Sequence, residues 1–140
     1  MLSLEYVKEH IKEIERDDML DRRFTKRLID FVPVEEWKDF GFKFTGDEPP
    51  TPKEWTEENI MDQLKSDVEF GIEKATNHRG ISAELMTMVC ASWLDVLENE
   101  TIDRSIYGWY GSALFKAIDK EYNFGLVDED TFNSSFYEEW

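Results

Sequence analysis

The side chains that most often carry covalent or metal chemistry are scarce in this chain. Its 140 residues include one cysteine and two histidines. Cys90 therefore has no partner for an intramolecular disulfide, and its neighbours Met86, Met88 and Trp93 favour a buried, unreactive thiol. One cysteine and two distant histidines also make a structural zinc site an unfavourable prediction.

Long apolar runs and glycine-rich motifs are missing too. No stretch approaches the roughly 20 apolar residues that a membrane-spanning helix needs, and the first residues, Met1 to Glu5, do not resemble a secretory signal. The sequence contains no glycine-rich phosphate loop and no dinucleotide-binding fingerprint, so no cofactor is predicted. These absences predict a cytoplasmic protein without a membrane partner.

Positive charge is the third deficit. Sixteen Lys and Arg face thirty-two Asp and Glu, which gives a formal net charge of −16. Residues 1–43 hold nine basic and eleven acidic residues, whereas residues 44–140 hold seven and twenty-one. Free nucleic acid and anionic membranes should be repelled by such a surface, whereas basic protein surfaces should be attracted and should associate faster.

Apolar and aromatic residues, in contrast, are plentiful enough for a folded core. Hydrophobic residues make up 41% of the chain and aromatic residues 14%, which excludes a disordered polyanion. A chain of this length suits one domain that needs neither disulfides nor metals. We therefore predict a single helical domain over residues 1–140, with a distinct C-terminal segment, 127–140, in which acidic and aromatic residues alternate.

The spacing of the apolar residues predicts an all-α fold, a compact bundle of five to six helices. No convincing run of alternating polar and apolar residues appears, so no sheet is expected. The predicted helices are one capped by Ser3, one from Asp17 or Asp18, a short one from Val34 to Phe40, a long one from Glu57 to about Asn77, one capped by Ser82 and one from Tyr110 to Tyr122. Thr51-Pro52-Lys53-Glu54 also has the composition of a helix start.

One of these helices should be central. Between Ser82 and about Leu97, apolar residues fall on nearly every side of the helix. A helix of that kind is predicted to be surrounded by its neighbours in the core.

A local basic cluster stands out against the acidic background. It consists of Arg22, Arg23, Lys26 and Arg27. These side chains can pair with acidic residues of the same chain or form a solvated helix face. Alternatively, they can form a self-complementary contact in a homodimer.

The acidic residues offer one route to enzymatic chemistry. Two acidic groups could hold Mg²⁺, which prefers oxygen ligands and commonly bridges to phosphates; they comprise Glu35, Glu36 and Asp39, followed by Glu54 and Glu57. This pattern resembles the helical nucleotide pyrophosphohydrolases. The chain departs from that pattern because Glu57 stands in place of an aspartate and a proline-rich loop separates the two groups.

A second resemblance covers about a third of the chain, residues 79–125. The residues that carry it are Arg79-Gly80-Ile81-Ser82-Ala83, Trp93-Leu94, Leu97-Glu98, Tyr110-Gly111 and Leu114-Phe115-Lys116-Ala117. They resemble small proteins from phages of Gram-positive bacteria. Compact acidic phage proteins include inhibitors of host defence, such as anti-CRISPR proteins that occupy nucleic-acid channels. The resemblance therefore implies a non-enzymatic inhibitor in the host cytoplasm.

Charge and resemblance together predict binding to a basic host protein, with a nucleic-acid-binding nuclease as the leading candidate. Carboxylates at helical intervals can offer a basic groove an alternative polyanion, and aromatic side chains can serve as anchors. The candidate contacts are Asp62, Glu69, Glu73, Asp128, Glu129, Asp130, Phe136, Tyr137, Glu138, Glu139 and Trp140. The alternatives are the Mg²⁺-dependent hydrolase and an accessory protein of phage assembly.

Overall fold

The computed structural model describes residues 1–11, 18–76, 80–98 and 111–128, and within these ranges every regular element is a helix. The prediction of an all-α bundle is therefore confirmed. The α-helices are α1 (Leu4–His10), α2 (Asp18–Leu28), α3 (Glu57–Thr76), α4 (Gly80–Glu98) and α5 (Gly111–Tyr122), and two 3-10 segments, η1 (Ile29–Phe31) and η2 (Val34–Phe40), follow α2.

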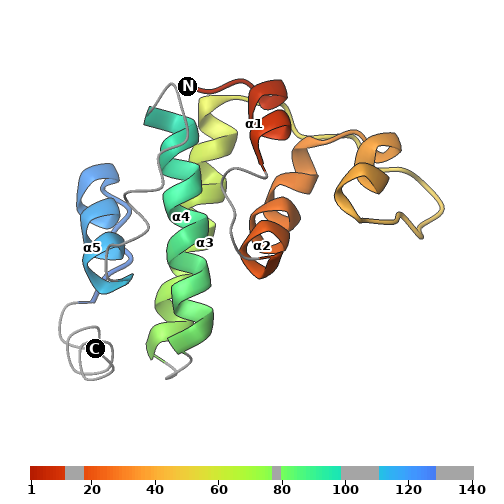
Figure 1. The fold of residues 1–140 in the computed structure, drawn as a ribbon. Helices are drawn as coiled ribbons and strands as arrows, with labels where there is room; N and C mark the ends of the chain where they lie inside the picture. The colour runs from red at the N-terminus through yellow and green to blue at the C-terminus, as the bar shows by residue number, and fades with distance from the viewer. Residues whose placement is uncertain (12–17, 77–79, 99–110, 129–140) are drawn as a thin grey trace.

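Helix α4 lies at the centre, as its apolar sequence predicts. Figure 1 shows α3 and α4 side by side along their length, with α5 on one side of the pair and α2 on the other. Met86, Val89, Trp93 and Val96 of α4 are essentially without solvent contact. Cys90 is fully buried on the same helix, as predicted from its neighbours, and burial raises the pKa of its thiol.

The Trp93 ring joins segments that are distant in the sequence. It lies 5.1 Å from the Phe24 ring of α2, 5.9 Å from the Phe31 ring of η1 and 6.3 Å from the Trp55 ring of the loop before α3. Aromatic contacts of this kind add stability beyond the apolar area that they bury. They fix α2, η1 and the loop against the α3–α4 pair.

Several helix ends follow the local chemistry of the sequence. The Ser3 hydroxyl accepts a hydrogen bond from the Tyr6 amide at 3.1 Å and caps α1. Gly41 ends η2 in the left-handed region, at φ +78°, where glycine has no steric penalty. The segment from Val34 to Phe40 is a 3-10 helix, however, rather than a regular α-helix.

The predicted start of the long helix is confirmed, whereas the additional helix start predicted at Thr51 is wrong. Helix α3 begins at Glu57, where the Thr56 hydroxyl accepts from the Asn59 amide, and residues 51–56 are not helical. The chain before Thr56 follows a different course because the Lys53 amide donates to the Asp30 carbonyl. The Trp55 indole also donates to the Leu2 carbonyl, 2.8 Å away.

Helix α4 begins at Gly80, two residues before the predicted cap Ser82. The connection predicted around Asn99 to Arg104 and a short helix expected from Thr131 lie outside the described residues.

Candidate macromolecule-binding surface

The solvent-facing side of α3 carries a row of carboxylates. Asp62, Glu69 and Glu73 are all exposed, and Glu58 extends the row by one turn. With 100° between successive residues, these four positions fall within about 60° of one another around the helix axis. At 1.5 Å per residue the row is about 22 Å long. Three of its members were predicted as partner contacts, and Glu58 was missed.

The lysines of α3 are directed to aromatic rings. Lys65 Nζ lies 5.8 Å from the centre of the Phe124 ring, and Lys74 Nζ lies 4.9 Å from the centre of the Phe70 ring. Within the described part of the chain, Glu58, Asp62 and Glu69 form no ion pair. Lys65 itself falls within about 20° of Glu58 around the helix axis and offsets part of this charge. Four carboxylates and one lysine leave the face negative.

The opposite side of α3 is anchored in the core. Ile60, Leu64 and Val68 are fully buried, and α3 packs along α4. Gly71 allows α5 to approach closely, because a Cβ atom built there would come within 2.3 Å of Phe115 Cζ. The carboxylate row is thus carried by a helix held on two sides.

A buried aspartate, which the sequence analysis did not single out, also holds α3 in place. Asp67 has no solvent exposure; its carboxylate accepts from the Trp93 indole at 2.7 Å and from the Gln63 amide at 3.3 Å, and it lies 3.3 Å from Arg27 Nε. Burial raises the pKa of Asp67 to about 6, although Arg27 and the two hydrogen bonds oppose the increase. This cluster joins α2, α3 and α4 through a single side chain.

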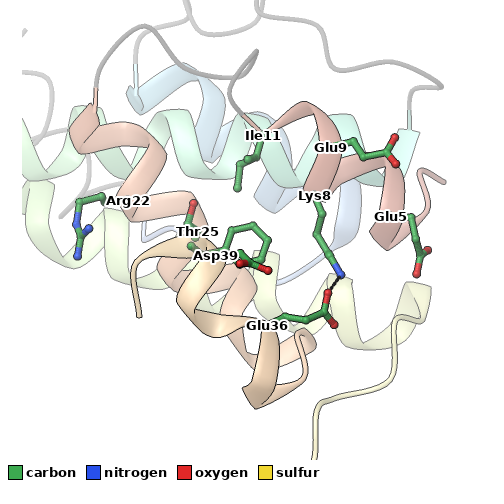
Figure 2. Close-up of a pocket in the computed structure, with 9 residues that line it drawn as sticks. Glu5, Lys8, Glu9, Ile11, Arg22, Thr25, Glu36 and Asp39 are labelled. Carbon is green, nitrogen blue, oxygen red and sulfur yellow. Dashed lines mark hydrogen bonds and ion pairs between the residues drawn. The ribbon is translucent and has the colours of Figure 1, made fainter. Parts of the chain in front are cut away.

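A cavity of about 640 Å³ opens between α1, α2 and η2 (Figure 2). Its lining residues are Glu5, Lys8, Glu9, Ile11, Arg22, Thr25, Glu36, Asp39 and Phe40. Lys8 and Glu36 form an ion pair across it, between α1 and η2. Among the described residues, four carboxylates and two cations line the cavity, so this part of its wall is acidic.

The predicted basic cluster is divided by the fold. Arg27 turns inward to Asp67, which confirms intramolecular pairing for this residue. Arg22, Arg23 and Lys26 line a separate hollow of about 370 Å³ beside Phe42, and in the described residues none of the three forms an ion pair. A homodimer contact at this hollow stays a prediction.

The five acids that were predicted, as an alternative, to hold Mg²⁺ do not lie together in one group. Among the residues that the structure describes, no cluster of three or more His, Cys, Asp and Glu could hold a metal ion. Glu36 is instead engaged by Lys8. Glu35, Asp39, Glu54 and Glu57 are exposed.

The predicted C-terminal contacts fall mostly outside the described residues. Only Asp128 is described, and it is exposed; the others, Glu129, Asp130, Phe136, Tyr137, Glu138, Glu139 and Trp140, lie beyond the last described position. The chain leading to Asp128 is held by Asp119 of α5, whose carboxylate accepts from the Leu126 amide at 2.6 Å and from the Val127 amide at 3.4 Å.

The histidines offer no further site in the described structure. The ring of His10 stacks on Tyr6 at 3.9 Å, and its Nδ1 lies 2.8 Å from the Tyr6 carbonyl. His78 lies outside the described ranges. No helix within those ranges is both long enough and apolar enough to cross a bilayer.

Comparisons with known proteins add no assignment. No family model, no curated protein and no solved structure matches this chain.

Proposed function

We propose that this protein is a non-enzymatic binding protein that places the exposed carboxylate row of α3 against a basic surface of a partner protein. The observation that carries the proposal is the row itself: Glu58, Asp62, Glu69 and Glu73 share one face of α3, and the one lysine beside them, Lys65, is directed to the Phe124 ring. Because Asp67 and the core fix the helix, the backbone that carries the carboxylates has little freedom to lose on binding, and only their side chains must be ordered.

A nucleic-acid-binding channel has the complementary character. Such channels hold the phosphate backbone with Lys and Arg, and association is favoured by the release of counterions. A helix with carboxylates over about 22 Å offers these cations a rigid alternative to phosphates. Together with the resemblance to small phage proteins, this supports a phage-encoded inhibitor of a host defence nuclease of the anti-CRISPR type, acting in the host cytoplasm.

The test compares two variants of equal charge. The first carries Asp62→Asn, Glu69→Gln and Glu73→Gln. The second, a matched control, carries Glu35→Gln, Asp47→Asn and Glu48→Gln, which are exposed acids on η2 and the following loop. Each protein is used to capture host proteins at low salt, and the captured protein is then assayed for DNA or RNA binding with and without the inhibitor.

The proposal expects a basic partner whose nucleic-acid binding is blocked. The α3 variant loses three exposed charge pairs, each of which contributes roughly 0.5 kcal/mol. It should therefore bind about tenfold more weakly than wild type, and its binding should depend less on salt. The control should bind as wild type does. Equal weakening by both variants would reduce the effect to net charge, and a partner whose nucleic-acid binding is unaffected would rule out occupation of its channel.

A further inference from the structure

We infer that the cavity between α1, α2 and η2 is a receptor site for one arginine side chain of the basic partner. The inference rests on the proposed function: the cavity would hold one specific side chain of the same basic partner, in addition to the electrostatic attraction exerted by α3. Anchor residues of this kind typically enter well-packed pockets and contribute much of the binding energy of an interface.

The cavity is lined by a buried hydroxyl that has no hydrogen-bond partner among the residues that the structure describes. Thr25 is 5% exposed and Ile11 is 6% exposed, and both line the cavity. Figure 2 shows the Thr25 side chain between those of Arg22 and Ile11. Within the described residues, the Thr25 hydroxyl makes no hydrogen bond. Burial of a hydroxyl without a hydrogen-bond partner costs free energy. A donor that enters the cavity would therefore find an unused acceptor in the Thr25 hydroxyl.

The wall supplies carboxylates that are still available to a cation. Glu9 of α1 and Asp39 of η2 form no ion pair in the described part of the chain. Glu36 is engaged by Lys8 and contributes little further charge. In Figure 2 the Glu9 carboxylate points away from Thr25 and Asp39, so the free carboxylate on the Thr25 side of the cavity is that of Asp39 on η2.

Arg22 lines the same cavity but is directed to its own aromatic partner. Its guanidinium carbon lies 5.6 Å from the centre of the Phe42 ring, and a Cβ built at Gly41 would lie 3.4 Å from its Nη1. Arg22 is therefore packed against Gly41 and Phe42 and does not neutralise Asp39.

These features fit a guanidinium better than other ligands. Ile11 and Phe40 offer apolar surface to the methylene stem of an arginine, and the head group would find the Asp39 carboxylate and the Thr25 hydroxyl. A planar guanidinium presents five donors in a fixed fork, which suits acceptors on several sides, whereas an ammonium is a more strongly hydrated point charge. An anion would meet the acidic wall and be repelled.

The test uses isotope-labelled protein and short blocked tripeptides, acetyl-Gly-Xaa-Gly-amide, with Xaa as arginine, lysine or norleucine, and spermidine as a free polyamine. Amide chemical shifts are followed at Ile11, Thr25 and Phe40 and along α3. The arginine peptide should give saturable shifts at the three cavity positions. Asp39→Asn should weaken its binding about tenfold through loss of a charged hydrogen bond, and Thr25→Val about fivefold.

Thr25→Val carries its own folding control. Because the hydroxyl has no partner in the described structure, its replacement by a side chain of similar shape should leave the melting temperature unchanged or higher. A clear decrease would show that the hydroxyl is already satisfied and would overturn the assignment of Thr25. Asp39 is exposed, so Asp39→Asn tests the cavity without disturbing the core.

The remaining outcomes separate the two proposals. Arginine-induced shifts confined to α3, equal shifts with norleucine, or equal binding of spermidine would each overturn the cavity assignment and leave the α3 proposal intact. If the cavity binds arginine while the triple α3 variant keeps full affinity for the captured partner, the role proposed for α3 fails and the cavity stands.

Discussion

Replacement of the buried Asp67 by asparagine should stabilise the protein in a pH-dependent manner. The pKa of Asp67 is raised from an ordinary value of 3.8 to about 6 in the folded protein, with burial as the main cause. The folded state therefore holds this proton more tightly than the unfolded state does. The resulting stabilisation is fully present below about pH 4 and is lost as the pH rises through about 6.

A difference of that size between the folded and unfolded pKa corresponds to about 3 kcal/mol. Asparagine has no charge to desolvate, and its amide oxygen can still accept from the Trp93 indole. The free energy of unfolding of Asp67→Asn, relative to wild type, should therefore increase by about 2–3 kcal/mol between pH 4 and pH 7.5.

Urea denaturation followed by tryptophan fluorescence measures this difference at each pH. Asp62→Asn on the exposed side of the same helix is the control, because it removes the same charge from solvent-accessible surface. Subtraction of the wild-type profile cancels the titration of the other carboxylates. A difference between Asp67→Asn and wild type that stays constant from pH 4 to 7.5, or that decreases, would refute the reasoning.

Three further substitutions test other contacts. Gly71→Ala should destabilise the protein by about 1–3 kcal/mol in urea denaturation, because the added Cβ would collide with Phe115, although alanine favours helices more than glycine does; an increase in stability would contradict the close α3–α5 packing. Trp93→Phe removes the indole donor to the Asp67 carboxylate and should cost about 2 kcal/mol or more, with a larger loss at pH 7.5 than at pH 4; a loss independent of pH would contradict this link. Asp119→Asn should speed amide hydrogen exchange at Leu126 and Val127, and unchanged exchange would show that the carboxylate does not hold this segment.

The sequence was a good guide to helices because their periodicity is local. Ile60, Leu64 and Val68 recur at helical spacing and lie fully buried on α3, as predicted. Apolar residues on nearly all sides of α4 correctly indicated its central position. The helix start expected near Thr51 failed because contacts with Leu2 and Asp30, far away in the sequence, direct the chain there.

The candidate sites were harder to predict from the sequence, because they too depend on contacts between residues that are far apart along the chain. Asp67 looks like any other acid of an acidic helix, and its burial depends on Arg27 and Trp93 from two other helices. The cavity is assembled from three segments, α1, α2 and η2, and no spacing pattern relates Glu9, Thr25 and Asp39. Exposed acids such as Asp62 and Glu69 could be chosen from periodicity alone, because the buried face of α3 fixes which face remains in solvent.

The central helix has a consequence for the unfolded chain. Helix α4 contains no lysine or arginine and only three acids, Glu84, Asp95 and Glu98. When this segment is exposed during folding, it would present a long apolar, aggregation-prone stretch to other molecules. A net charge of −16 keeps such chains apart at low ionic strength. Salt shortens the range of that repulsion to about 10 Å at 0.1 M and about 3 Å at 1 M. Recovery of native protein from urea should accordingly decline when dilution is made into concentrated salt, and aggregates should increase with protein concentration.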